Sequence, residues 1–291
     1  MIYPGGAGAA GASVRPMPSL SVIVPATDRP PTLDRCRAAI VRAAGSPDLL
    51  VIDGPAGLPV CVARNAGAER ATGDVLVFVD SDVEIHRDAL TRIAEHFATD
   101  PELTAVFGSY DDAPARGGAV AAFRNLLHHH VHQHAAGPAE TFWTGLGAVR
   151  RDAFRAAGGD QPGARIRLDP AIQGTHLKAW TLGSMVHTDF ARRGVPWVAL
   201  LLRGGHRSTA LNLGWRHRLS AAACSLGAVT LLARRPLPTA AALLALLALN
   251  HDFYRLLARR RGPGEALLGV GLHAIHHLTA VAAVPGARAG G

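Results

Sequence analysis

Apolar and polar positions along the first two thirds of the chain form blocks that predict strands alternating with helices. Short runs rich in Val, Ile and Leu, bounded by turn residues, are typical of buried strands. Between them, apolar residues recur at helical spacing, as where Leu90, Ile93 and Phe97 share one face. This alternation predicts an α/β fold with a mostly parallel sheet, helices on both faces and right-handed crossovers. The expected strands are 19–25, 48–53, 75–79 and 103–108, and the expected helices are 32–44, 62–71 and 86–98.

The middle of the chain predicts further strands around a histidine-rich helix. Residues 142–151 are expected to form a strand whose glycines let a ligand or backbone come close. Residues 165–177 predict a strand, a turn at Asp169-Pro170 and a second strand. Five histidines fall within 124–134 without an acidic or cysteine partner that would complete a zinc set. An amphipathic surface helix, or a segment over an acceptor cleft, is therefore favoured over a metal site.

After Arg218 the pattern changes to three apolar runs, 219–233, 237–249 and 266–284. Each is short beside the ~20 residues that cross a bilayer. Arginines flank the first two runs, at 216 and 218 and again at 255–261, so the positive-inside rule favours a hairpin with these arginines in the cytoplasm. The third run is compatible with spanning or with lying at the interface. A soluble helical bundle is less favoured, because the runs have almost no polar face.

Composition narrows the class of protein further. The chain has 291 residues, 48% of them apolar, and a net charge of +8, which suits nucleic acid, anionic lipid or phosphorylated substrates. No zinc-finger spacing, RNA-binding aromatic motif or basic-region helix is present, so no nucleic-acid partner is expected. Three scattered cysteines indicate a reducing compartment. The Gly- and Ala-rich residues 1–18 lack the pattern of a signal peptide and are expected to be a disordered leader.

The candidate chemistry lies where the strand 75–79 ends in Asp80-Ser81-Asp82. Ligands of open α/β sheets bind beyond the carboxyl ends of strands. Two carboxylates at such a rim suit Mg²⁺ or Mn²⁺, which substrate phosphates then help to coordinate. The alternative is a turn whose aspartates cap the next helix. A metal-dependent nucleotidyltransferase ranks low, because no Gly-rich phosphate loop follows the first strand.

An ordered set of motifs gives the chain a resemblance to a known family. The motifs are Ser-Val-Ile-Val-Pro ending at Pro25, then Asp53, Ala-Arg64-Asn-Ala-Gly, and Phe-Val-Asp80-Ser-Asp82. In this order they resemble family-2 glycosyltransferases of the Rossmann-like GT-A fold. The resemblance runs from about 19 to 203. It includes 126–133, 141–145, 147–152 and 174–182, which recur in a membrane-associated bacterial branch of that family.

The resemblance implies a donor side built from five residues. Pro25 ends the first donor-side strand, and Asp53 would accept a hydrogen bond from the donor's nucleobase. Arg64 would lie near the diphosphate, Asp80 would face the ribose or the metal, and Asp82 would bind the divalent cation. Viewed alone, Asp53 could begin a turn with the glycine after it, and Arg64 could be a solvated helix charge.

The resemblance also assigns roles to five later residues. His176 would approach the same metal or the diphosphate, and Lys178, the only lysine, would pair with Trp180 to stabilise the leaving nucleoside diphosphate. Trp143 and Gly145 would line the acceptor side. The alternatives are a packed or exposed histidine and ordinary core tryptophans.

The sequence departs from the family pattern at the expected base. Inverting members carry an acidic pair, usually Glu-Asp, on a helix before the late strand, and here only five residues separate Gly159 from Arg165. Asp160 is the nearest carboxylate and a candidate substitute base. Three possibilities stay open: a weakened or inactive homologue that still binds nucleotide sugar, an enzyme using Asp160 or another carboxylate, or a shortened version of an active enzyme.

The resemblance therefore implies an inverting glycosyltransferase of hexosyltransferase type. It would bind a nucleotide-diphospho-sugar with Mg²⁺ or Mn²⁺ and transfer the sugar to a lipid-linked or other cell-envelope acceptor. The alternative is a membrane-bound binding or scaffold module. The expected location is the inner membrane, with the catalytic domain cytoplasmic. The expected organisation is a leader (1–18), a GT-A domain (19–203), a basic juxtamembrane linker (204–218), two or three membrane helices (219–285) and a tail (286–291).

Overall fold

The computed structural model describes residues 16–27, 29–44, 48–55, 57–115, 117–156, 164–204, 211 and 214–289. Its first part is an eight-stranded sheet with the order β2-β1-β3-β7-β5-β8-β4, with β6 paired to β8. The strands are β1 (Leu20–Pro25), β2 (Asp48–Ile52), β3 (Val75–Val79), β4 (Val83–Ile85), β5 (Leu103–Tyr110), β6 (Gly137–Ala139), β7 (Leu146–Arg150) and β8 (Arg165–His176).

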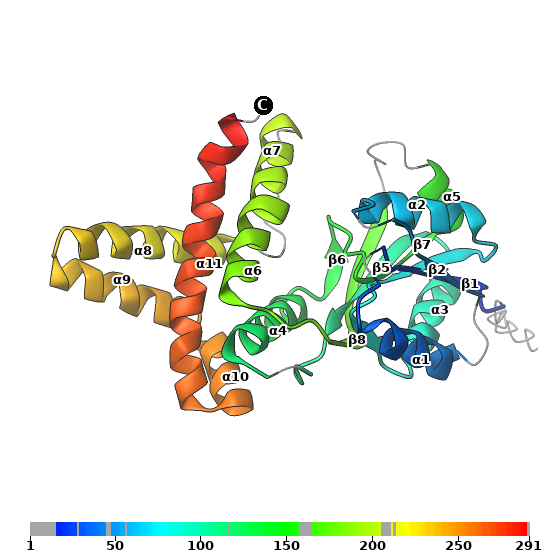
Figure 1. Ribbon diagram of the computed structural model, residues 1–291, viewed down its shortest axis with the longest axis horizontal. Helices are drawn as coiled ribbons and strands as arrows, with labels where there is room; N and C mark the ends of the chain where they lie inside the picture. The colour runs from blue at the N-terminus through cyan, green and yellow to red at the C-terminus, as the bar shows by residue number, and fades with distance from the viewer. Residues whose placement is uncertain are drawn as a thin grey trace, which may run out of the picture.

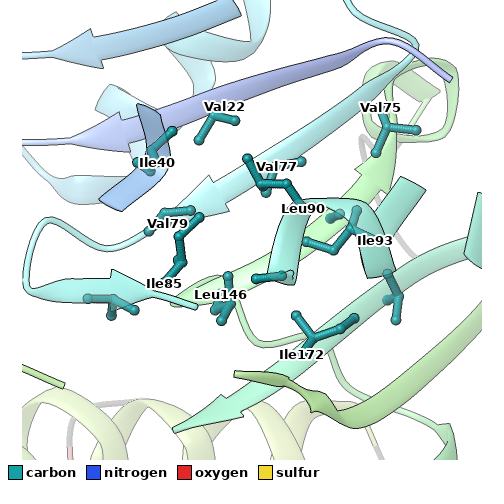
Figure 2. Packing of buried hydrophobic residues seen from close by; sticks show 14 of the residues in the cluster. Val22, Ile40, Val75, Val77, Val79, Ile85, Leu90, Ile93, Leu146 and Ile172 are labelled. Carbon is teal, nitrogen blue, oxygen red and sulfur yellow. The ribbon is translucent and has the colours of Figure 1, made fainter. Parts of the chain in front are cut away.

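Helices cover both faces of this sheet (Figure 1). On one face, α1 and α3 pack on Val22, Val77 and Leu146, and Figure 2 shows this cluster with Ile40 and Ile93 pointing into it. The opposite face packs against α2 and α5. The helices of this part are α1 (Leu33–Ala44), α2 (Val60–Arg70), α3 (Ala89–Thr99), α4 (Ala119–Gln133) and α5 (Arg151–Ala156).

The sheet is mixed rather than mostly parallel. β1 pairs in parallel with β2 and β3, and β5 pairs in parallel with β8. The pairs β3–β7, β5–β7, β4–β8 and β6–β8 are antiparallel. The predicted α/β fold with helices on both faces is confirmed, and the expected parallel pairing holds for β2-β1-β3 and for β5–β8.

The predicted turn at Asp169-Pro170 is wrong, because β8 runs through both residues as one strand. The pairing of β5 with β8 shifts register between Phe107 and Ser109, opposite this point. Such an irregularity tolerates a proline within a sheet, since proline cannot donate to the ladder. The Asp169 carboxylate accepts a hydrogen bond from the backbone N–H of Ala171 (2.9 Å) and lies 2.7 Å from His96 Nε2.

A helical part follows the sheet and lies to one side of it (Figure 1). The α8–α9 hairpin extends away from the sheet, and α11 runs across the base of that hairpin (Figure 1). The order is α6 (Leu182–His187), the π-helical η1 (Thr188–Gly194), α7 (Val195–Gly204), α8 (Trp215–Leu232), α9 (Pro236–Leu249), α10 (His251–Arg261) and α11 (Pro263–Ala289).

The three predicted apolar runs correspond to α8, α9 and α11. In the described chain, one helix is long and apolar enough to cross a membrane, over Pro263–Ala287 with a mean hydropathy of 1.6. The α9–α10 pair meets the same criteria only as one broken span, bent by 73°.

The helical part shares a core with the sheet domain through α4. α4 packs on β5 and β8 and also on α10 and α11. Phe123 and Leu126 of α4 are buried in one cluster with Phe253 and Leu257 of α10 and Leu272 of α11. The sheet domain and the helical part are therefore packed together.

Candidate functional site

The two aspartates lie at the carboxyl-end rim of β3. The backbone N–H of Asp80 donates to Gly145 O (3.0 Å), and Val83 N–H donates to Asp80 O (2.9 Å), which closes a tight turn into β4. Arg64 Nη2 of α2 donates to Asp80 Oδ1 at 2.6 Å. Burial at the crowded rim raises the pKa of Asp80 and the charge of Asp82 adds to this effect, while Arg64 opposes it.

Asp82 is joined to the end of β8. Its carbonyl accepts the backbone N–H of Leu177 (2.7 Å), and His176 Nε2 lies 3.6 Å from its Oδ2. Burial by itself would raise the pKa of Asp82, but the contact with His176 and the charge of Lys178 together lower it. The antiparallel β4–β8 pairing places His176 opposite Val83, which explains why residues far apart in sequence meet. The predicted Asp82–His176 pair is thus brought together.

Aromatic rings from β5, α4 and the loop before β7 pack together beside the His176 ring. Tyr110 lies parallel to His176 with ring centroids 4.2 Å apart. His128 of α4 lies 4.2 Å from Tyr110 on a tilted ring, and Trp143 meets Tyr110 edge-on at 5.0 Å. Sequence reasoning did not single out Tyr110. The available signal was its position at the carboxyl end of a strand, where ligands of α/β sheets bind.

Two cations flank Trp180. Lys178 Nζ lies 4.6 Å from the centroid of the Trp180 ring, and Arg124 Cζ of α4 lies 5.1 Å from it. Cations within about 6 Å of an indole are attracted to its face. The predicted Lys178–Trp180 pair is therefore in contact, and Arg124 is an additional basic residue that the sequence pattern did not reveal.

Pro25 ends β1, and Asp53 directly follows the end of β2. These neighbouring strands run in the same direction as β3, so both residues reach the same edge of the sheet. Pro25 is the last residue of its strand and is buried. Asp53 is largely exposed and pairs with Arg29 Nη2 at 2.5 Å. Asp53 therefore lies at the rim of the sheet with its side chain exposed to solvent.

Trp143 and Gly145, the residues expected on the acceptor side, are positioned by close packing. A Cβ on Gly145 would lie 2.4 Å from Trp143 Cζ2, so only glycine fits beneath this indole. The Trp143 ring contacts Tyr110 and His128 rather than standing free. Asp160, the candidate base, lies outside the described residues.

The histidines of α4 fasten this helix to the sheet. His129 Nδ1 lies 2.9 Å from Tyr110 O, and His132 Nδ1 lies 2.8 Å from Gly108 O, both of β5. His134 Nδ1 lies 2.7 Å from His130 O in its own helix. Burial lowers the pKa of His132 to about 4. α4 is therefore a helix, but the expected position on the surface is wrong, because the helix packs on β5 and β8 and most of its side chains are buried.

The side chains at the rim offer a partial set of ligands for a divalent cation. Among the described residues, no group of three or more His, Cys, Asp or Glu side chains is already gathered around one point. Asp80 is held by Arg64, which leaves Asp82 and His176 as adjacent donors. One carboxylate and one imidazole fit an ion such as Mn²⁺ that keeps waters and takes phosphate oxygens from a substrate. The residues therefore fit such an ion.

Comparisons with known proteins find a family model and solved structures that are similar to this chain. Residues 34–158 match the model of glycosyl transferase family 2. A mannosyltransferase from Pyrobaculum calidifontis, in complex with GDP-Man and Mn²⁺, has a similar structure, with a TM-score of 0.53 and 17% identity. This similarity covers 91% of this chain and 87% of that one.

A second similar structure is glucosyl-3-phosphoglycerate synthase from Mycobacterium tuberculosis, in complex with Mn²⁺ and UDP-glucose. It has a TM-score of 0.40 and 17% identity, over 66% of this chain and 81% of that one. A search of curated proteins found no match to this chain.

Proposed function

Because the chain has the GT-A fold of family 2 glycosyltransferases, we propose that it binds a nucleotide-diphospho-sugar together with Mg²⁺ or Mn²⁺ and transfers the sugar, with inversion, to a lipid-linked or other cell-envelope acceptor. It is a hexosyltransferase attached to the inner membrane, with its sheet domain in the cytoplasm. The observation that carries the proposal is the meeting of Asp82, His176 and Lys178 at one rim of the sheet.

The residues of the rim suit the charge that such a reaction develops. Departure of a nucleoside diphosphate builds negative charge on its phosphates, and cations placed there stabilise the transition state more than the ground state. Lys178 lies over Trp180 beside His176, and Arg64 holds a guanidinium at Asp80, where planar bidentate contact with phosphate is favourable. Asp82 and His176 would hold the divalent cation, which supplies further charge stabilisation when bound.

Other residues at or near this rim have proposed roles in binding the two substrates and in proton transfer. Pro25 and Asp53 would bound the donor's nucleoside, and Trp143 and Gly145 would bound the acceptor. Asp160 is the proposed acceptor base in place of the missing acidic pair, since the acceptor hydroxyl must lose a proton.

Calorimetric titration with uridine and guanosine diphosphates, with and without Mn²⁺, tests the proposal. Binding is expected to depend on Mn²⁺ for one of the two nucleotides, and Asp82→Ala is expected to abolish the metal-dependent part. Asp88→Ala is the matched control, because Asp88 pairs with Arg92 at an exposed position. Absence of metal-dependent binding to either nucleotide would overturn the proposal.

The second candidate is a binding or scaffold module without transferase activity, motivated by the missing acidic pair. It predicts nucleotide binding without sugar transfer. Hydrolysis or transfer above background that is lost in Asp160→Asn would exclude this candidate.

A further inference from the structure

Building on the proposed membrane attachment, we infer that the α8–α9 hairpin is the element that enters the lipid bilayer, and that α11 lies outside the hydrocarbon core. This assignment reverses what length and apolar composition alone select, because α11 is the described helix that passes as a single span. The assignment depends on which surfaces of each helix carry polar contacts and which carry exposed apolar side chains.

The hairpin has polar and small residues at the contact between its two helices and most of its leucines on the outside. Asn250 Nδ2 donates to Ser220 Oγ (2.9 Å) at the base, where both residues are buried, and Thr239 Oγ1 donates to Thr230 Oγ1 (2.9 Å) near the tip. Between these bonds, Gly227 faces Ala242. Small residues and interhelical hydrogen bonds at the contact are typical of helices that pack in lipid.

The outer surface of the hairpin is apolar on both helices. Most of its large apolar side chains do not contact the rest of the protein, and Leu232 and Leu237 at the tip are 85% and 83% exposed. An exposed apolar patch of this kind marks an interaction site. The other strongly exposed ones are Leu219, Leu226, Val229, Leu231, Leu243 and Leu244.

The hairpin has the ends of a membrane-inserted element, and its apolar stretch is somewhat shorter than an average bilayer core. The apolar part of α8, residues 219–232, rises about 21 Å at 1.5 Å per residue, against a hydrocarbon core of about 30 Å. Arginine side chains that reach the headgroups and local thinning of the bilayer accommodate a shortfall of this kind. Trp215 and Arg216 stand at its base, and Arg234 and Arg235 form its tip. Tryptophan and arginine at both ends of an apolar segment suit the two headgroup layers, so the partner is a lipid bilayer.

The first half of α11 packs against α4, the helix that joins the helical part to the sheet. Leu272 packs with Phe123 of α4, which itself covers β5 and β8. α10 lies along this half of α11 and carries arginines, of which Arg260 pairs with Asp112 just beyond β5. If this half of α11 lay in the hydrocarbon core, α4 and the arginine-rich α10, which pack on it, would also have to enter the core.

One side of the second half of α11 packs against η1 and α7. His276 Nδ1 lies 2.8 Å from Asp189 Oδ2 of η1, and Asp189 pairs with Arg124 of α4 at 3.1 Å. A Cβ on Gly194 would lie 2.7 Å from Ala283, so η1 touches α11 closely further along. Because α11 crosses the base of the hairpin (Figure 1), a bilayer entered by the hairpin leaves α11 along its surface.

Site-directed spin labelling of the full chain in vesicles of phosphatidylethanolamine and phosphatidylglycerol tests this assignment. Single cysteines replace exposed residues, in a background with Cys61→Ser, Cys36→Ala and Cys224→Ala. Leu226 and Leu244 probe the hairpin, Leu268 and Val281 probe α11, and Val62 of α2 is the aqueous control. Accessibility to oxygen is compared with accessibility to a water-soluble nickel chelate.

The ratio of oxygen to nickel accessibility is expected to be several-fold higher at both hairpin positions than at both α11 positions, with the lowest ratio at the control. High ratios at the two α11 positions, equal to those of the hairpin, would overturn the inference while leaving membrane attachment intact. Low ratios at all five positions would show that no segment enters lipid, and would overturn the attachment as well as the inference.

Discussion

At the scale of residues, the pairing of Arg64 with Asp80 determines how the rim receives a substrate. The guanidinium is mostly buried and donates at 2.6 Å to a carboxylate whose pKa burial raises. A diphosphate arriving with its cation would offer this guanidinium new oxygens and release Asp80. Arg64 is therefore expected to contribute to binding of the nucleotide rather than to the fold alone.

Arg64→Ala is expected to weaken binding of the preferred nucleoside diphosphate by roughly tenfold or more, because a partly buried charge-assisted contact is lost. Calorimetric titration with Mn²⁺ measures the effect. Arg165→Ala is the matched control, since Arg165 starts β8 at the opposite end and pairs with Asp100 in an exposed position. Equal affinity in the Arg64 variant and the control would exclude this role.

The neutral histidines of α4 predict a loss of stability in acid. Burial lowers the pKa of His132 to about 4, against 6.5 for the free side chain, so the unfolded chain takes up the proton more readily. This part of the stability is present above pH 6.5 and is lost as the pH falls from 6.5 toward 4. Between about pH 7.5 and pH 5 the loss from His132 is about 2 kcal/mol.

Denaturant unfolding of the detergent-solubilised protein at these two pH values measures the loss. His132→Asn keeps a donor for the Gly108 carbonyl and is expected to reduce the loss by about 2 kcal/mol. An unchanged difference between the two pH values would contradict a neutral buried His132.

At the scale of elements, the loop before β7 supports the rim through Gly145. Its carbonyl accepts the Asp80 N–H, and its missing side chain leaves room for Trp143. Gly145→Ala is expected to lower the free energy of unfolding by about 1–3 kcal/mol, because the added methyl overfills this contact. Denaturant unfolding checks this value. Gly183→Ala in α6 is the control, where a Cβ would meet nothing within 4 Å, and a cost as large there would refute the explanation.

Elements with a strong local pattern could be predicted, and contacts between distant segments could not. The alternation of Val-rich runs with amphipathic stretches predicted β1, β3 and α3 close to their observed bounds, whereas α4 begins at Ala119, before the histidine-rich segment expected from 124. Pro170 appeared to require a turn, because the sequence does not reveal the register shift that accommodates it in β8. Family motifs identified Asp80, Asp82 and Lys178, whereas Tyr110 and Arg124 reach the site only through tertiary packing.

At the scale of the whole molecule, Asp189 joins three segments that are distant in sequence. It pairs with Arg124 of α4 and contacts His276 of α11, and its side chain and that of Arg124 are nearly fully buried. Arg124 also lies over Trp180 at the rim. The position of α11 is thereby linked to the group proposed to stabilise the leaving diphosphate.

Asp189→Asn is expected to destabilise the protein by about 3 kcal/mol, because it leaves the Arg124 guanidinium buried without a counter-charge. Unfolding in detergent measures this value. Asp88→Asn breaks an exposed pair within α3 and its N-terminal flank and should cost less than about 1 kcal/mol. Similar decreases in the free energy of unfolding in both variants would show that Asp189 does not stabilise the packing of α4 against η1 and α11.

The shared core between α4 and the C-terminal helices has a practical consequence for anyone preparing the protein. A fragment cut after Trp180 would keep every strand of the sheet and each rim residue discussed above. It would nevertheless present Phe123, Leu126, Leu127 and Val131 to solvent along one side of α4, where α10 and α11 now cover them. Such a fragment is expected to aggregate in buffer without detergent. Removal of the C-terminal helices would therefore not yield a soluble, monomeric sheet domain.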